Sequence, residues 1–168
     1  MKLETERLYM KILTQDESEA YYLLSQNHGF RQFQISDYRK SSIEDANIWI
    51  SKIEKYQQRN GFGIVGIFEK ESLTLIGLGA LKHLENEGKS PVELMYRISD
   101  QFWGKGYGLE VASALVNHAF YTLNMDHLVA TVDPQNYPSK QILTKLGFKF
   151  EKKVKIESYE EELHKLFR

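Results

Sequence analysis

The chain has 168 residues, a length that suits one domain burying roughly 70% of its unfolded surface. Lysine and arginine together number 22 and aspartate and glutamate 23, so the net charge of −1 lacks the basic excess of a typical nucleic-acid-binding protein. The lack of cysteine excludes disulfides, thiolate metal sites and cysteine nucleophiles, and we expect no metal cofactor.

The N-terminal stretch MKLETERLYMKI mixes charged and apolar residues, unlike the apolar core of a signal peptide. No apolar run approaches the roughly 20 residues that a bilayer requires. We therefore expect a cytoplasmic protein with one domain over residues 1–168, and neither a membrane nor a nucleic acid as partner.

The first third of the chain predicts one strand and two helices. Residues 6–13 alternate well enough for a strand, and residues 16–27 follow as a helix that Thr14 or Asp16 caps. A second helix starts in a capping box between Ser42 and Asp45 and stops at Asn60-Gly61. The side chains expected to point inward are Ala20, Leu23 and Leu24 in the first helix and Ile43, Ala46, Ile50 and Ile53 in the second.

The period then changes to that of strands. Residues 62–70, 73–84 and 91–99 predict three antiparallel strands joined by hairpins. After a glycine-rich segment comes a helix with an apolar stripe, then a strand at 127–133, a helix ending at Gly147, and two closing strands at 148–156 and 161–168. The fold class is mixed α/β (α+β), with a mostly antiparallel sheet of about six or seven strands flanked by about four helices.

The glycine-rich segment GKGYG is the most informative motif. Gly104, Gly106 and Gly108 stand between a predicted strand and a predicted helix, where unpaired N–H groups and the helix dipole favour an anion such as a diphosphate. A tight turn or close packing would also explain the glycines. A P-loop is excluded because no Lys-Ser or Lys-Thr follows, and a dinucleotide fingerprint because position 109 is leucine.

The stretch WGKGYGLEVASALVNHAF resembles the acyl-CoA pyrophosphate loop and helix of the GNAT N-acetyltransferase superfamily. The closer likeness is to the branch with the ribosomal-protein N-terminal alanine and serine acetyltransferases. Three further stretches resemble that branch in the expected order: LETERLYMKIL at 3–13, VELMYRI at 92–98 and DPQNYPSKQILTKLGFKFE at 133–151.

This resemblance implies acetyl-CoA as co-substrate. Backbone N–H groups of the loop would hold the diphosphate, with Lys105 either adding charge or lying in solvent, and Glu110 would point away and be structural. The strand at 92–98 would splay from the next strand at a bulge, so that the pantetheine arm takes the vacated hydrogen bonds. The implied cofactor-binding residues are Leu94, Tyr96, Ile98, Trp103, Gly104, Lys105, Gly106, Tyr107, Gly108, Leu109, Asn136 and Ser139.

Acetyl transfer to an amine requires a proton acceptor. The resemblance assigns this role to Glu93, and the alternative is a solvent-facing glutamate on an alternating strand. His83 and Glu85 are weaker substitutes. An α-amine, with a pKa of about 7.7–8, is deprotonated by a weaker base than a lysine or polyamine amine, whose pKa is near 10.4.

The leaving thiolate needs only modest acid assistance, because a thiol of this kind has a pKa of about 8.5. The resemblance assigns proton donation to Ser139 of the Asn-x-x-Ser segment, and Tyr137 is the alternative acid. Asn136 would also serve as a helix N-cap that accepts from the Ser139 N–H, a role that is compatible with a ligand contact.

The acceptor site is less clearly marked. Aromatic residues of the N-terminal helices either line it or belong to the core: Phe30, Phe33, Tyr38, Trp49 and Tyr56. Asp37, Glu44 and Asp45 would attract a cationic acceptor or simply be solvated.

The leading hypothesis is transfer of acetyl to a protein or peptide N-terminal α-amine, by direct attack in a ternary complex. The alternatives are acetylation of a small amine such as a polyamine or antibiotic, a non-catalytic acyl-CoA-binding module, and a regulatory domain for another nucleotide. Both a monomer and a homodimer are compatible with the sequence.

Overall fold

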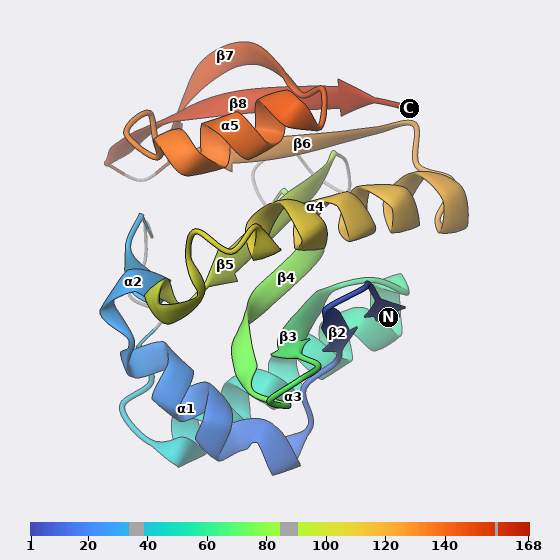
Figure 1. Cartoon of the computed structure of the whole chain (residues 1–168). Helices are drawn as coiled ribbons and strands as arrows, with labels where there is room; N and C mark the ends of the chain where they lie inside the picture. Colours follow the sequence, from blue (N-terminus) through green and yellow to red (C-terminus); the bar gives the residue numbers. More distant parts are fainter. Residues whose placement is uncertain (34–38, 85–90, 157) are drawn as a thin grey trace.

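An eight-stranded sheet with strand order β1-β2-β3-β4-β5-β6-β8-β7 organises the protein in the computed structural model, which describes residues 1–33, 39–84, 91–156 and 158–168 (Figure 1). The strands are β1 (Lys2–Glu4), β2 (Leu8–Lys11), β3 (Ile64–Glu69), β4 (Leu75–His83), β5 (Val92–Ile98), β6 (His127–Val132), β7 (Lys149–Ile156) and β8 (Tyr159–Phe167). The α-helices in the described ranges are α1 (Ser18–Gln26), α2 (His28–Arg31), α3 (Ile43–Asn60), α4 (Tyr107–Asn117) and α5 (Tyr137–Lys145).

The predicted fold class is confirmed, with two elements more than expected. Every neighbouring pair of strands is antiparallel except β5 and β6. The sheet has eight strands rather than six or seven, because the three residues of β1 form a strand against β2. The four-residue helix α2 raises the number of α-helices in the described ranges to five. Both additions are too short to show a periodic pattern in the sequence.

The inward face predicted for the first helix was right for Leu24 and wrong for Ala20 and Leu23. Ala20 is exposed and Leu23 is 61% exposed, whereas Tyr21 and Leu24 are buried. Tyr21 takes the inward position because its ring stacks on Trp49 of α3, with 4.3 Å between the ring centroids. In α3 the predicted Ala46, Ile50 and Ile53 are buried, but Ile43, the first residue of the helix, is exposed.

The two faces of the sheet carry separate helices and separate apolar clusters. Leu94 and Ile98 of β5 pack with Val111 and Leu115 of α4 in one cluster. The other cluster joins Leu78 of β4 to residues of α1 and α3. Because successive residues of a strand point to opposite faces, β5 presents its even-numbered side chains to the face of α4 and its odd-numbered ones to the opposite face.

The sheet opens between β5 and β6. In the described part of the chain these two strands pair at one position only, Glu93 with Val129, while β5 pairs with β4 continuously from Val92 to Ile98. Figure 1 shows β6, β8 and β7 with α5 in the upper half of the view, β1 to β3 with α1 and α3 in the lower half, and β4 running through the middle. The backbone of β5 beyond Glu93 is therefore left open on one side. Among the described residues, no helix has both the length and the apolar character needed to span a membrane.

Candidate active site

The open side of β5 presents backbone groups toward β6. Ser99 donates its N–H to Ile76 O across the β4–β5 ladder at 2.8 Å, so the odd-numbered residues of β5 direct their backbone groups to β4. The even-numbered residues direct theirs to the side where β6 has separated. These are the residues that the sequence predicts to pair with a pantetheine arm, Leu94, Tyr96 and Ile98.

One of these backbone groups already has a partner. The indole Nε1 of Trp103 donates to Ile98 O at 2.7 Å, and the Trp103 side chain is 48% exposed at the start of the glycine loop. The side chain thus ties the loop to the end of β5. In the described part of the chain, no side chain donates a hydrogen bond to the carbonyl of Leu94 or Tyr96.

The three positions of the loop require glycine for different structural reasons. Gly104 and Gly106 adopt φ of 75° and 82°, the left-handed region that favours glycine, and a Cβ on either would meet no backbone. Gly108 lies inside α4, where a Cβ would come within 2.9 Å of Ile142 Cδ1 of α5. The first two glycines shape the loop, and the third lets α4 and α5 approach each other.

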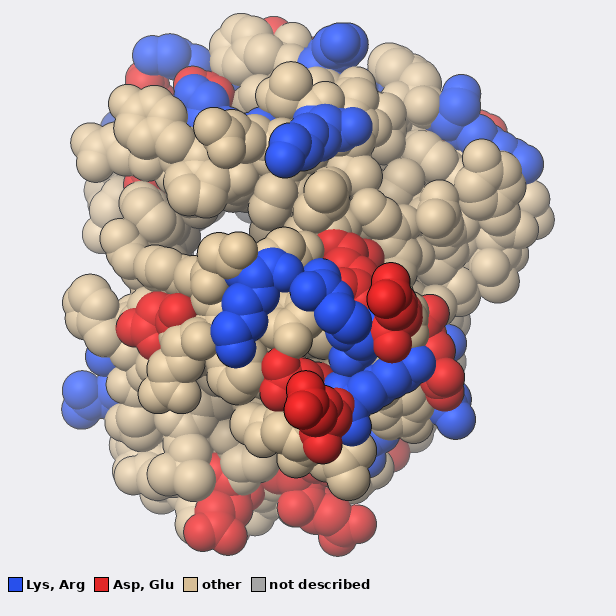
Figure 2. Space-filling view, viewed as in Figure 1, with Lys and Arg blue, Asp and Glu red and all other residues tan. Residues whose placement is uncertain are grey.

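The N-terminus of α4 has no side-chain cap. The first turn of a helix leaves its N–H groups without intrahelical partners, here from Tyr107 to Leu109, at the positive end of the helix dipole. Figure 2 shows an opening between the upper and lower halves of the molecule, with Lys and Arg side chains gathered directly below it, where Figure 1 draws the start of α4. The arrangement suits an anion.

The charged and polar side chains at this helix start have contacts within the protein. Glu110 accepts hydrogen bonds from the Thr5 hydroxyl and from the backbone N–H of Arg7, at 2.5 and 3.0 Å, in agreement with the structural role predicted for it. Lys105 is exposed, with its Nζ 4.9 Å from the centroid of the Phe102 ring. Tyr107 is buried and its hydroxyl donates to Glu69 at 2.6 Å.

Glu93 lies where β5 and β6 still pair, at the vertex of the opening. It is 5% exposed, so the alternative of a solvent-facing glutamate is wrong. Its Oε1 accepts from the Thr131 hydroxyl at 2.5 Å and from the Thr131 N–H at 3.3 Å. Burial raises the pKa of Glu93 above its ordinary value, and the hydrogen bonds from Thr131 oppose that rise.

A second buried carboxyl, which the sequence reasoning missed, shares the face of Glu93. Glu161 of β8 is 6% exposed and lies on the same face of the sheet as Leu163, two residues further along the strand. Leu163 pairs with Thr131 of β6, and Thr131 lies on the face of Glu93 because Glu93 pairs with Val129. Burial raises the pKa of Glu161 to about 7; the negative charges of Asp133 and Glu93 add to the rise, and Arg97 opposes it. The signal was a glutamate two residues before an apolar one on a strand, which places both on the same face.

On the opposite face of β5, Tyr96 and Ser139 are in contact. Their hydroxyl oxygens lie 3.0 Å apart, and either group can donate. Asn136 accepts from the Ser139 N–H at 3.2 Å, so the predicted capping role of Asn136 is confirmed. Burial raises the pKa of Tyr96 to about 12, so the phenol stays neutral and able to donate. The sequence had assigned Tyr96 only a backbone role.

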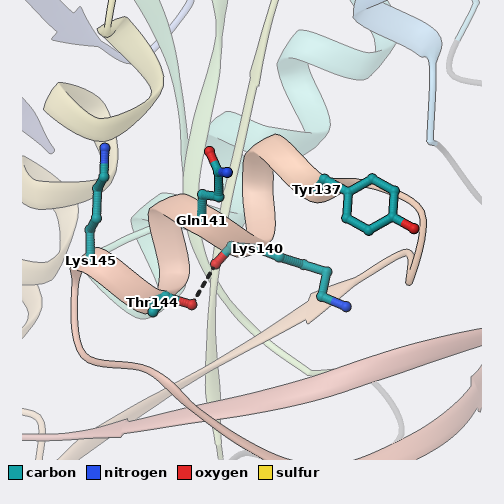
Figure 3. A pocket seen from close by; sticks show the side chains of 5 residues that line it. All are labelled: Tyr137, Lys140, Gln141, Thr144 and Lys145. Atoms are coloured by element: carbon teal, nitrogen blue, oxygen red, sulfur yellow. Dashed lines mark hydrogen bonds between the residues drawn. The ribbon is translucent and has the colours of Figure 1, made fainter.

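Tyr137 lies away from this contact. It is 68% exposed, and residues two apart on a helix do not face the same way. Its ring stands at one end of an open hollow of about 550 Å³ on the outer side of α5, which Figure 3 shows. The residues lining the hollow are Tyr137, Lys140, Gln141, Thr144 and Lys145.

Of the weaker candidates for the base, His83 does not lie beside Glu93. His83 pairs with Val92, which puts its side chain on the other face of the sheet from Glu93, and its ring lies 5.3 Å from that of Phe62. Glu85 lies outside the described residues. Over the part of the chain that the structure describes, no three histidine or acidic side chains gather in a way that suits a metal ion.

The predicted acceptor aromatics belong largely to packing. Phe30 is buried, Trp49 stacks on Tyr21, and the hydroxyl of Tyr56 accepts from the His83 N–H at 2.8 Å. Phe33 is partly exposed with a positive φ. Tyr38 and Asp37 lie outside the described residues. Of the acidic candidates on α3, Glu44 is exposed and Asp45 accepts from the Ser41 hydroxyl.

Comparisons with known proteins agree with this geometry. A family model described as an acetyltransferase (GNAT) domain matches residues 7–149. The N-acetyltransferase YoaA of Bacillus subtilis (strain 168), itself uncharacterized, is 29% identical over 155 residues, which cover 89% of this chain and 83% of YoaA.

Solved structures share the fold over nearly the whole chain. The ribosomal-protein-S5-alanine acetyltransferase of Vibrio fischeri superposes with a TM-score of 0.83 at 16% identity, covering 99% of this chain and 96% of that one. RimL, a ribosomal L7/L12 alpha-N-protein acetyltransferase solved in complex with coenzyme A, superposes with a TM-score of 0.82 at 14% identity, covering 99% and 98%. The match of the domain family across residues 7–149 identifies this chain as a member of the GNAT acetyltransferase family, an acetyl-CoA-dependent enzyme.

Proposed function

We propose that this acetyltransferase transfers the acetyl group of acetyl-CoA to the N-terminal α-amine of a peptide or protein, by direct attack in a ternary complex. The observation that carries the choice of acceptor is the buried carboxyl of Glu161, whose pKa of about 7 lies close to that of an α-amine. A fold shared with ribosomal-protein acetyltransferases is consistent with this choice.

The co-substrate would lie in the opening between β5 and β6. In this proposal the pantetheine arm bonds to the open edge of β5 through Leu94 and Tyr96, and its diphosphate lies on the N–H groups between Gly104 and Leu109. The left-handed glycines and the uncapped start of α4 support this assignment. Asn136 and Ser139, at the start of α5, would contact the arm near its sulfur.

The two faces of β5 would then serve the two proton transfers. The acceptor amine approaches from the face of Glu93 and Glu161, which take its proton as a coupled pair. The amine nitrogen forms a bond to the thioester carbonyl carbon, the carbon–sulfur bond breaks, and the nitrogen loses its second proton to solvent. The thiolate leaves on the opposite face, where Ser139 gives it a proton and regains one from solvent, while Tyr96 donates a hydrogen bond to Ser139.

The pKa of the proton acceptor favours an α-amine. The pKa of an α-ammonium group, about 7.7–8, is only about one pKa unit above that of a carboxyl near 7, so the proton transfer to the carboxyl is only slightly unfavourable. The pKa of an alkyl ammonium group, about 10.4, is more than two pKa units higher still, and the transfer is correspondingly less favourable. A general base works best when its pKa lies near that of its task. Small amines such as polyamines and antibiotics are the alternative acceptors, and the experiment below includes them.

A screen that measures thiol release tests the proposal. The purified protein is incubated with acetyl-CoA and, separately, with N-terminal peptides, polyamines and aminoglycosides. The matched control is a peptide with a blocked N-terminus and a free lysine. We expect release with free N-termini and none with the blocked peptide. Turnover with polyamines or antibiotics alone would reject the α-amine, and acetyl-CoA binding without thiol release in any case would indicate a binding module.

A further inference from the structure

The turn between β1 and β2 holds the glycine loop through a single arginine. We propose that Arg7 is a positioning residue, which fixes the peptide between Lys105 and Gly106 so that the Gly106 N–H points toward the diphosphate of bound acetyl-CoA. This inference rests on the diphosphate site proposed above. It adds a residue that touches neither co-substrate nor acceptor and acts through the backbone of the loop.

The geometry of one peptide bond carries the argument. Arg7 Nη1 donates to Lys105 O at 2.9 Å. A trans peptide is planar, with its C=O and N–H pointing in opposite directions. Holding the Lys105 carbonyl toward Arg7 therefore aims the Gly106 N–H away from Arg7. The peptide needs such a restraint because Gly106, with φ of 82°, has no side chain to limit rotation about its backbone bonds.

Arg7 is itself held rigidly. Its Nε and Nη2 lie 2.8 and 2.6 Å from Glu110 Oε2, a two-pronged ion pair, and its guanidinium stands 4.5 Å from the centre of the Tyr107 ring. Arg7 also donates its backbone N–H to the other oxygen of Glu110. Because Tyr107 and Glu110 both belong to the first turn of α4, the arginine is fixed to the helix whose N-terminus it orients.

A purely stabilising ion pair would not explain the bond to Lys105. The Arg7 side chain is partly exposed, and exposed ion pairs contribute little to stability. The three nitrogens of the guanidinium are divided between a carboxylate and a loop carbonyl, a division that the fork geometry of arginine allows and the single ammonium of lysine does not. The arrangement predicts an effect on co-substrate affinity rather than on folding.

The test compares two acetyl donors. Acetyl-CoA carries the diphosphate, whereas S-acetylpantetheine lacks it. In the Arg7→Met variant we expect the KM for acetyl-CoA and the Kd for CoA to rise about tenfold, the change expected when one charge-assisted hydrogen bond stops orienting the site. We expect kcat with acetyl-CoA and the KM for S-acetylpantetheine to stay within about twofold of wild type.

Further variants separate direction from charge. Arg7→Lys keeps the charge but not the fork, so it should behave like Arg7→Met, and full rescue by lysine would overturn the inference. Glu110→Gln frees Arg7 from its ion pair and should weaken CoA binding in the same way. If Arg7→Met fails to fold, the CoA affinity of Glu110→Gln decides the test. The matched control is Lys153→Met, which breaks an exposed ion pair with Glu160 far from the loop and should change neither donor.

Two results would overturn the inference. One is an equal loss with both donors, which would mean a general structural effect, and the other is an unchanged Kd for CoA. The Gly106→Val variant distinguishes the second result from a failure of the proposed site. If Gly106→Val abolishes CoA binding while Arg7→Met does not affect it, only the role of Arg7 is rejected. If neither variant affects CoA binding, the diphosphate site itself is rejected together with this inference.

Discussion

Glu93 and Ser139 lie on opposite sides of strand β5. Glu93 is an odd-numbered residue of the strand and bonds to Thr131, whereas Ser139 reaches the strand through even-numbered Tyr96 on the other face. A thioester held at the edge of β5 would therefore have a proton acceptor on one side and a proton donor on the other. This separation keeps the two groups from exchanging a proton with each other.

Loss of the donor should slow turnover without weakening co-substrate binding. For Ser139→Ala we expect kcat to fall by about tenfold to a hundredfold, because a thiolate of pKa near 8.5 needs only part of the usual acid assistance. Tyr96→Phe should cost less, since the serine hydroxyl remains. Steady-state kinetics and CoA titration measure both effects. Because the two hydroxyls are in contact, the double variant should lose less than the product of the single losses. Independent effects would contradict their cooperation.

The parts of the site that the sequence could predict depend on local patterns. The loop was readable because a strand, three alternate glycines and an apolar helical stripe follow each other directly along the chain. The sequence could not predict that the three glycines have different roles. Gly108 is needed because Ile142 of α5 packs against it, and Ile142 lies 34 residues further along the chain, where sequence spacing does not place it beside Gly108.

The parts that were missed depend on distant pairing. Glu161 looked like one acid in the charged run EEELHK, and its burial follows from pairing between β8 and β6. Arg7 gave no signal because its loop partner is 98 positions away. Likewise Leu23 was expected inside because it is apolar, whereas the inner position of α1 is occupied by Tyr21, whose stacking partner lies on another helix.

Removing the hydroxyl that supports Glu93 should shift the pH profile. The Thr131 hydroxyl stabilises the ionised form of Glu93, so Thr131→Val should raise the pKa of Glu93 further. If Glu93 takes the proton, the acidic limb of kcat/KM moves to higher pH, and activity well above that limb changes little. Thr144→Val, which removes a hydroxyl on the outer side of α5, is the control. An unmoved acidic limb would exclude Glu93 as the base.

The loop glycines should tolerate alanine unequally. In Gly108→Ala the new Cβ crowds the end of the flexible Ile142 side chain at 2.9 Å and makes an ordinary contact with the Tyr96 ring at 3.7 Å, and a gain of about 1 kcal/mol in helix propensity offsets the crowding. We expect unchanged CoA affinity and stability within about 1 kcal/mol. Gly106→Ala forces a side chain into a left-handed conformation, at a cost of about 1–2 kcal/mol, and should weaken CoA binding. Calorimetric titration of both variants checks this, and equal behaviour would refute the distinction.

Replacing Glu161 should make the protein more stable and less active. Its carboxyl titrates near 4.5 in an unfolded chain and near 7 in the folded one, so between these values the folded protein binds more protons and its unfolding free energy falls as the pH rises. Above pH 7, Glu161→Gln should therefore be more stable than wild type.

The gain is on the order of 2 kcal/mol, allowing for water that still reaches the carboxyl, because one pKa unit corresponds to about 1.4 kcal/mol. Below pH 4.5 the two proteins should converge, since both side chains are then neutral. Urea unfolding at several pH values measures the difference, and thiol release should show kcat reduced by at least about tenfold if the carboxyl takes part in proton removal. A variant less stable than wild type at pH 8 would mean that the ionised Glu161 has a stabilising partner, and a variant of full activity would remove the carboxyl from the reaction.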